Sequence, residues 1–244
     1  MRKMRLWGAA SVAAMLVGGC TSPSTVPGTS VAADAEVAEA PYPQRPYWGD
    51  THLHTSNSID AFGFGVRLDP EAALRFAKGE EVVATSGMKA RLDRPLDFLV
   101  IADHSDGLGA TRRLYDAPRA LIRDPALRRW HDIMHASPDG PGRVTAEIID
   151  QAANGTLPPA LRDPAANEEG TRTIWRSSAK IVERYNRPGK FTAFHGFEWT
   201  SMPGGNNLHR VVMFRDGFAE AVQVIPFGSQ PPLDQVAKLY DYMD

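Results

Sequence analysis

Long apolar runs and short alternating segments mark the predicted strands of the chain. The segment 96–102 is apolar at every position except Asp97, which is typical of a strand buried on both faces of a parallel sheet. In the segment 47–55 the even-numbered residues would share one face of a strand. Further strands are predicted at 190–200 and 208–215, and a hairpin at 81–92.

Helical periodicity occupies much of the remaining chain. Asp69, Pro70 and Glu71 provide an N-cap, a first-turn proline and a first-turn acid, and they predict a helix that ends at Gly79. Further helices are predicted at 118–135, 142–153, 168–186 and from 233 onward. Because strands and helices alternate, the sequence predicts an α/β fold, in which 107–186 form an inserted helical layer.

The composition narrows the range of partners. The 244 residues include 27 Lys and Arg against 29 Asp and Glu, so no global positive field is available to hold nucleic acid, and a small-molecule substrate is expected instead. The single cysteine excludes an internal disulfide and a cysteine-only zinc site. A metal site would therefore have to be built from histidines and carboxylates.

The first twenty residues have the order of a secretory signal. Arg2, Lys3 and Arg5 precede the apolar run 6–17, which is shorter than the roughly 20 residues of a membrane-spanning helix. The run closes in Leu-Val-Gly-Gly-Cys, ending at Cys20, and resembles a bacterial lipobox. This resemblance implies that Cys20 is diacylated on its sulfur. The alternative is an ordinary signal peptide with an incidental cysteine.

A tether and one folded domain are predicted to follow the signal. Residues 21–46 are rich in proline, serine and threonine and lack helical or strand periodicity, and the folded domain is expected at 47–244. Thr21, directly after the cysteine, resembles an outer-membrane sorting signal. The protein is therefore expected to be exported and lipid-anchored to the membrane facing the periplasm, in the outer membrane.

Histidines and carboxylates gather where predicted strands begin or end. His52 and His54 lie two positions apart on a strand, so their side chains would project from one face and converge on one divalent ion. Asp103 and His104 follow the apolar strand at the end where α/β proteins collect ligands. Packed or exposed strand histidines and a helix cap are the non-functional alternatives.

Two further candidates lie near the C-terminus. Glu198 stands between two aromatic residues, where an unpaired carboxylate would be costly to bury, so a metal ion or an arginine is the expected partner. His209 follows eleven residues later at the start of a strand. With no thiolate available, the whole set would suit zinc, manganese or iron. His131 and His135 lack the residues of a His-Glu-x-x-His motif between them and are assigned to a helix surface.

These motifs, taken in order, resemble an uncharacterised bacterial family related to the polymerase-and-histidinol-phosphatase (PHP) domain. The resemblance spans roughly Tyr47 to Asp244, and the motifs that carry it lie in Gly49–Thr55, Arg94–His104, Gly196–Thr200 and Asn206–Arg210. It implies a distorted seven-stranded β/α barrel that holds up to three divalent metals at its C-terminal mouth and hydrolyses phosphate esters.

Carried over residue by residue, the resemblance implies a set of metal ligands. Glu198 would bridge two metals, and Asp60 stands where the opening motif often has a further ligand. Asp50 and Asp103 would accept hydrogen bonds around the ligands. His195 has no counterpart among the ligands. The full implied ligand set is His52, His54, Asp60, His104, Glu198 and His209.

The later ligands of the PHP pattern, a Cys or His and an Asp-x-His, have no counterpart before Asp244. The chain is therefore expected to be the N-terminal part of a partial barrel, with catalysis expected of a longer protein. The leading prediction is a metal-dependent hydrolase, foremost a phosphoesterase, with Arg67 or Arg210 as candidates to neutralise a phosphate. The alternatives are a metal-dependent amidase or lactonase, and a surface lipoprotein that binds a ligand or partner without turnover.

Overall fold

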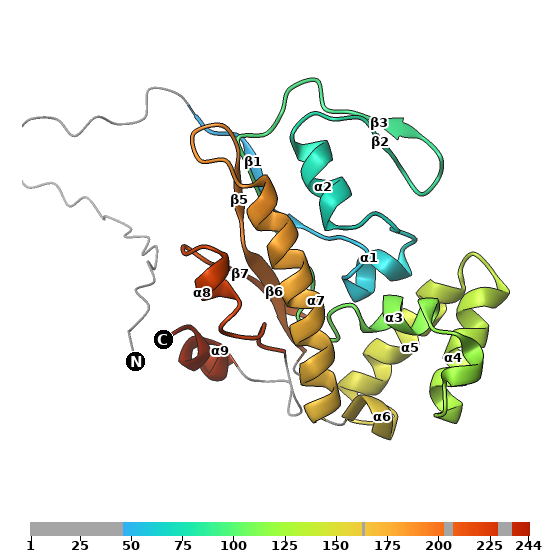
Figure 1. Ribbon diagram of the computed structural model, residues 1–244. Helices are drawn as coiled ribbons and strands as arrows, with labels where there is room; N and C mark the ends of the chain where they lie inside the picture. Colours follow the sequence, from blue (N-terminus) through green and yellow to red (C-terminus); the bar gives the residue numbers. More distant parts are fainter. Residues whose placement is uncertain (1–45, 163, 203–206, 229–235) are drawn as a thin grey trace, which may run out of the picture. The chain divides into compact units, whose positions relative to one another are not determined.

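The computed structural model describes residues 46–162, 164–202, 207–228 and 236–244, and residues Tyr47–Asp244 form a unit of their own. The predicted signal peptide, Cys20 and the tether up to residue 45 lie outside the described residues. The architecture of the described unit follows from one parallel sheet, one antiparallel ribbon and the helices that cover them (Figure 1).

A parallel sheet of three short strands positions the N-terminal half of the site. Its order is β1 (Gly49–Leu53), β4 (Phe98–Ile101) and β5 (Thr192–Phe194), with β4 in the centre. All four residues of β4 are apolar and three of them are buried, which confirms the prediction for 96–102. Because the strands are parallel, the residues that follow each of them meet at one edge of the sheet.

Helices α2 (Pro70–Ala77) and α7 (Pro164–Tyr185) supply the apolar cover of this sheet. Their buried residues form one core with the sheet, and this core includes Leu74, Leu99 and Val182. The predicted start of α2 is confirmed. The Asp69 side chain accepts a hydrogen bond of 2.9 Å from the Ala72 N–H, and Pro70 occupies the first turn.

Strands β6 (Gly196–Ser201) and β7 (Leu208–Met213) form an antiparallel ribbon. It packs its aromatic side chains, Phe197 and Trp199, against Trp175 of α7 and Leu239 of α9 (Val236–Met243). The short helix α8 (Phe218–Ala221) contributes to the same core. Helix α7 therefore packs against both the sheet and the ribbon. In Figure 1 it is the long helix that passes in front of them.

The prediction of one strand over 190–200 is wrong, because the chain changes sheets at His195. The His195 carbonyl accepts a hydrogen bond from the Phe214 N–H at 2.8 Å, and β6 then pairs with β7 instead of β4. Gly196 permits this crossing, since a Cβ atom there would lie 2.5 Å from a methyl group of Val100 in β4.

The predicted helical layer is present and has its own small core of Trp130, Met134 and Val144. The predicted helix at 118–135 is divided by Asp124, whose side chain caps α4. The layer consists of α3 (Ala110–Asp116), the 3-10 turn η1 (Arg119–Leu121), α4 (Pro125–Ala136), α5 (Gly140–Ala153), α6 (Pro159–Arg162) and α7.

Two other short segments complete the described chain. The predicted hairpin is confirmed as β2 (Val82–Val83) paired with β3 (Lys89–Ala90). Helix α1 (Ile59–Gly63) was not predicted.

Within the described ranges the strands form one three-stranded and two two-stranded sheets, and they do not close into a barrel. None of the described helices combines the length and apolarity that a membrane span requires.

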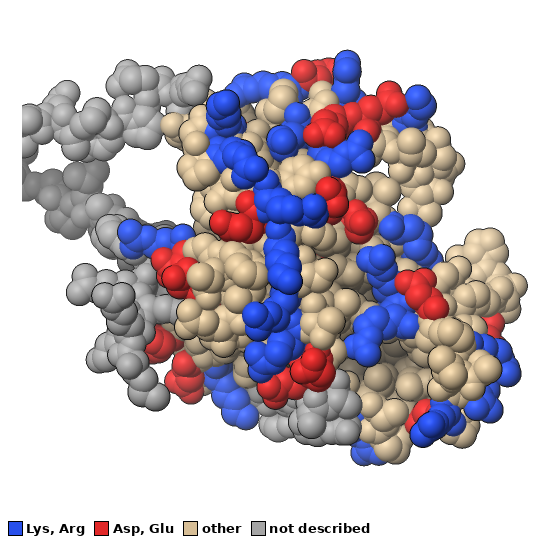
Figure 2. Space-filling view, viewed as in Figure 1, with Lys and Arg blue, Asp and Glu red and all other residues tan. Residues whose placement is uncertain are grey.

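Basic side chains gather in a line over the exposed face of α7 (Figure 2). Arg176, Lys180 and Arg184 recur at intervals of four residues and are exposed. Acidic residues flank the line, and Arg184 pairs with Glu71 of α2 at 3.2 Å. This face is therefore of mixed charge.

Truncation of the central strand should destabilise the whole unit. Leu99→Ala removes a completely buried side chain from the core beneath α2 and α7 and should cost about 2–5 kcal/mol of unfolding free energy. Urea denaturation followed by circular dichroism measures the loss. Val83→Ala, in an exposed strand position, is the matched control and should change the free energy by less than about 0.5 kcal/mol. Equal losses in the two variants would contradict the assignment of the core.

Candidate metal centre

Glu198 lies at the middle of the candidate site. It projects from the interior of β6, whereas the sequence placed it at the end of a strand. The backbone of Glu198 pairs with the continuation of β4, because its N–H donates to the Asp103 carbonyl at 3.0 Å and its carbonyl accepts from the Ser105 N–H at 2.8 Å. The pairing sets Glu198 beside His104 at the carboxyl edge of the parallel sheet.

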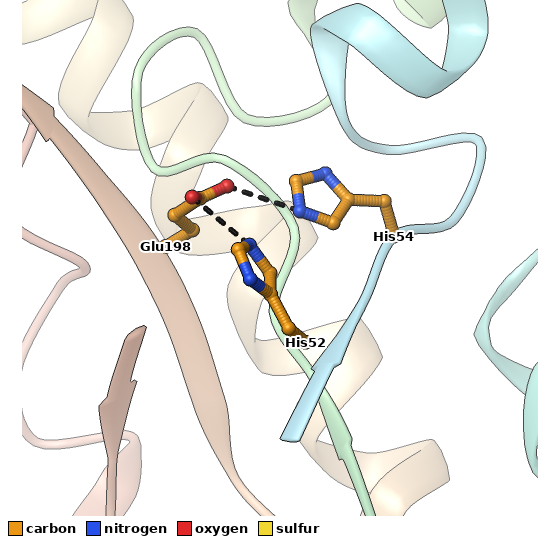
Figure 3. A group of neighbouring side chains, drawn as sticks. All are labelled: His52, His54 and Glu198. Atoms are coloured by element: carbon orange, nitrogen blue, oxygen red, sulfur yellow. Dashed lines mark ion pairs between the residues drawn. The ribbon is translucent and has the colours of Figure 1, made fainter. Parts of the chain in front are cut away.

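Each oxygen of the Glu198 carboxylate faces two imidazoles. Oε1 lies 2.9 Å from His52 Nε2 and 3.0 Å from His209 Nδ1. Oε2 lies 3.0 Å from His54 Nε2 and 3.4 Å from His104 Nε2. Figure 3 shows the side chains of His52 and His54 pointing toward the carboxylate from one side, as expected for residues two apart on β1 and just beyond it. Four of the predicted histidines are therefore brought together.

Asp60 joins the cluster from helix α1. Its Oδ1 lies 3.1 Å from His54 Nδ1, and its Oδ2 lies 3.4 Å from His104 Nε2. The hydroxyl of Ser58 lies 2.7 Å from His54 Nδ1 and donates to Asp60 Oδ1 at 2.6 Å. All six predicted ligands thus lie in one cluster, and the short helix α1 is the element that delivers Asp60.

The donor atoms fall into three overlapping groups that could each hold an ion. The atoms of each group lie within 4.8 Å of one another. Ligand distances of about 2.0–2.2 Å place neighbouring ligands of a divalent ion roughly 3 Å apart, close to the distances between these imidazoles and carboxylates. The nitrogen and oxygen donors suit zinc, manganese or iron. The groups are His52, His54 and Glu198; His54, Asp60 and His104; and His104, Glu198 and His209.

One side of the cluster is open to solvent. The side chains of His52 and His209 are 46% and 37% exposed, whereas that of Glu198 is 2% exposed. Structural zinc sites are closed by protein ligands, while catalytic sites keep a position free for water or substrate. The open side therefore favours a site that exchanges ligands with solvent.

Without metal, the cluster is held together by ion pairs. Burial by itself lowers the pKa of His54, but hydrogen bonds and charges from Asp60 and Glu198 raise it to about 10. Burial raises the pKa of Glu198, but hydrogen bonds from His54 and His52 lower it to about 2. Burial likewise opposes ionisation of Asp60, and hydrogen bonds from His104, His54 and Ser58 hold its pKa well below the usual range.

Hydroxyl groups orient two of the imidazoles. The Thr200 Oγ1 lies 3.0 Å from His104 Nδ1 and 3.1 Å from His209 Nδ1. If His104 binds a metal through Nε2, its Nδ1 faces a hydrogen-bonding partner, the usual arrangement around metal-bound histidine. Sequence reasoning missed Thr200 and Ser58, although Thr200 is two residues after Glu198 on one strand and so shares its face.

The two predicted supporting acids act through the backbone and through a neighbouring threonine. Asp50 Oδ1 accepts a hydrogen bond from the backbone N–H of His52 at 2.8 Å, so this contact positions the backbone of a candidate ligand and not its imidazole. Asp103 is buried and accepts from the Thr55 N–H at 2.5 Å and the Thr55 hydroxyl at 2.8 Å. Burial raises the pKa of Asp103 to about 6, although the hydrogen bonds from Thr55 oppose the rise.

The remaining histidines lie outside the cluster. His195 is buried, and its Nε2 lies 3.3 Å from the Glu183 carboxylate. The assignment of His131 to a helix surface is wrong, because this ring is buried and its Nε2 lies 3.1 Å from the Ala117 carbonyl. His135, one turn further along α4, is exposed, as predicted.

The two arginines proposed to meet a phosphate have other contacts. Arg67 donates through Nη1 to the carbonyls of Phe62 and Val66, at 2.7 and 2.9 Å. Arg210 donates to the His209 carbonyl at 2.8 Å, and strand alternation puts its side chain on the opposite face of β7 from that of His209. Of these contacts only that of Arg210 reaches a cluster residue, and it goes to the backbone carbonyl of His209 and not to a side chain of the cluster.

The described chain combines helices and strands around a candidate centre for divalent metal ions, formed by four histidines and two carboxylates. The chain belongs to the family described as "Protein of unknown function (DUF3604)", whose model matches residues 41–244. This match confirms the expectation of a family of unknown function. Neither the curated proteins nor the solved structures contain a significant match to the chain.

Replacement of the central carboxylate should abolish metal binding. Glu198→Gln keeps the size of the side chain but removes the charge that faces four imidazoles, so metal content by mass spectrometry should fall at least tenfold, as for loss of a ligand. Glu183→Gln is the matched control, because this carboxylate also contacts a buried histidine but lies outside the cluster. Metal retained in full by the Glu198 variant would contradict the site.

The stability of the metal-free protein should fall as the pH rises from about 6.5 to about 10. Folded His54 keeps a proton that the unfolded chain releases above its ordinary pKa of 6.5, so its contribution is complete below pH 6.5 and is lost through about pH 10. One proton limits the slope to about 1.4 kcal/mol per pH unit. Urea midpoints of the chelator-treated protein measure this slope. The slope should diminish in His54→Gln and persist in His135→Gln, and a flat profile would refute the ion-pair description.

Proposed function

We propose that the protein is a metal-dependent hydrolase, with phosphoesters as the leading class of substrate. The observation that carries the proposal is the Glu198 carboxylate, which presents each of its oxygens to two imidazoles at a solvent-accessible edge of the sheet. A carboxylate in this position is suited to bridge two ions. Divalent ions held there would supply Lewis-acid chemistry for the attack of water on a phosphoryl or carbonyl centre.

The chain's own residues would hold the ligands in place. His54 offers Nε2 on the side of Glu198, while its Nδ1 lies against Ser58 and Asp60. This division of its two nitrogens fixes the orientation of the ring before an ion binds. Thr200 has the same effect on His104. A preorganised ligand set of this kind lowers the cost of ordering side chains when metal binds.

The charge balance supports an anionic substrate. Among the candidate ligands, the carboxylates of Asp60 and Glu198 supply two negative charges, and two divalent ions would exceed these ligand charges by two positive charges. A phosphoester would partly neutralise this excess, and it would do so without Arg67 or Arg210. The relation to the PHP domain is part of this proposal and is supported by the order of the ligand motifs in the sequence.

We extend the proposal to the location of the protein. The charged, apolar and small-residue order of residues 1–20 supports export and a lipid anchor at Cys20, with the domain facing the periplasm. Mass spectrometry of the mature protein from a membrane fraction tests this point independently, through the mass of a diacylated N-terminal cysteine.

The hydrolase proposal is tested by metal content and turnover measured on the same preparations. The full chain, and a longer reading frame where one exists, would be loaded with zinc, manganese or iron and screened against phosphomonoesters, phosphodiesters and lactones. His52→Ala/His54→Ala should lose metal and at least about a hundredfold of the rate, because two ligands of one ion disappear. The control His135→Gln should keep both. Stoichiometric metal without hydrolysis of any of these substrates would favour a binding protein and reject the enzyme.

A further inference from the structure

The residue that follows α1, four positions after Asp60, is a phenylalanine exposed to solvent. Phe64 is 87% exposed, a larger fraction than for any other large apolar residue in the described part of the chain. Phe62, two residues earlier, is buried. Exposed apolar residues are common singly, so exposure alone does not assign a role to Phe64. Its position and the way its backbone is held provide the argument.

The backbone on both sides of Phe64 is firmly held. The Gly65 and Val66 N–H groups donate to the carbonyls of Phe62 and Ala61, at 3.1 and 2.9 Å. Arg67 also donates to carbonyls on both sides of Phe64, and its guanidinium lies 3.7 Å from the centre of the Phe62 ring. The loop is thus tied to its own helix, while the ring of Phe64 remains in solvent.

Two glycines make this loop possible. Gly63 packs against α5, where a Cβ atom would lie 2.5 Å from the Thr145 hydroxyl oxygen. Gly65 has a φ of +99°, a conformation that side chains disfavour. The loop is therefore built to pass close to α5 and to turn sharply directly after Phe64.

The helical register places Phe64 on the face of α1 that carries a metal ligand. Phe64 follows Asp60 by four residues, and its N–H donates to the Asp60 carbonyl at 2.8 Å, as one turn of helix requires. Residues four apart on a helix have Cβ atoms about 5–6 Å from each other. The exposed ring is thus one helical turn from the carboxylate that contacts His54 and His104.

We infer that Phe64 forms an apolar wall of the substrate site, and that the substrate is an ester with an aryl or similarly apolar group next to the bond that is cleaved. This inference rests on the proposed function, because the cluster must bind the polar end of the ligand. An aromatic side chain on a firmly held backbone contacts an apolar group with less loss of conformational entropy than one on a mobile loop. The ring would bind that group, and the cluster would bind the phosphoryl or carbonyl end.

Paired probes that differ in one apolar group test the inference through binding. Calorimetry on the zinc-loaded full chain would compare phenylphosphonate with methylphosphonate, and benzohydroxamate with acetohydroxamate. The wild type should prefer the phenyl member of at least one pair by about three- to tenfold, the range of a single aromatic contact. Phe64→Ser should abolish the preference without weakening the methyl member, and Phe64→Tyr should restore it.

Leu121→Ser is the matched control, because Leu121 is 74% exposed and lies in η1, outside the cluster. It should leave the preference unchanged. The absence of a Phe64-dependent preference in both pairs, including the absence of any binding, would overturn the inference. Hydrolysis of monomethyl phosphate by the wild type tests the proposed function separately, because this substrate has no apolar group for Phe64 to contact. A preference for the phenyl member that is seen only in the hydroxamate pair would support the role of Phe64 as a wall of the site, and it would contradict a phosphoester as the substrate.

Discussion

A carboxylate buried as completely as Glu198 loses its hydration, and the loss costs several kcal/mol unless charged or hydrogen-bonding groups replace the water. Four imidazoles provide the replacement here, and they come from β1, from the chain just beyond β1, from the end of β4 and from β7. A shift of any one of these segments would remove one of the four imidazoles that compensate the charge. The placement of the ribbon beside the carboxyl edge of the sheet therefore depends on how the charge of Glu198 is compensated.

The apolar cores supply stabilisation that offsets the free-energy cost of burying this polar cluster. Helix α7 contributes Val182 to the core of the parallel sheet and Trp175 to the core of the ribbon, so that one long helix ties both layers together. The polar groups begin where these cores end, at the carboxyl edge of the sheet. The fold thus separates the residues that provide stability from those that could provide chemistry, as α/β proteins commonly do.

Local pattern predicted much of this arrangement. Continuous apolarity identified β4, alternation on β1 put His52 and His54 on one face, and polar residues after β4 marked the edge of the sheet. The division of residues 190–200 into β5 and β6, which belong to different sheets, was not predictable. Apolar periodicity indicates that a strand is buried but not which strand it pairs with. Helix α1 is too short to show periodicity, and the burial of His131 depends on a carbonyl contributed by a distant turn. The failures therefore concern tertiary contacts, which a single sequence does not encode in its local pattern.

The ligands of the cluster are drawn from almost the whole described length of the chain, from His52 near its start to His209 near its end. Ions bound by all of them would act as a cross-link that closes a very long loop. Closing such a loop removes conformational entropy mainly from the unfolded chain, in the manner of a disulfide between distant cysteines. Within this chain, whose one cysteine is Cys20, such a metal centre would serve as the cross-link that no internal disulfide can provide.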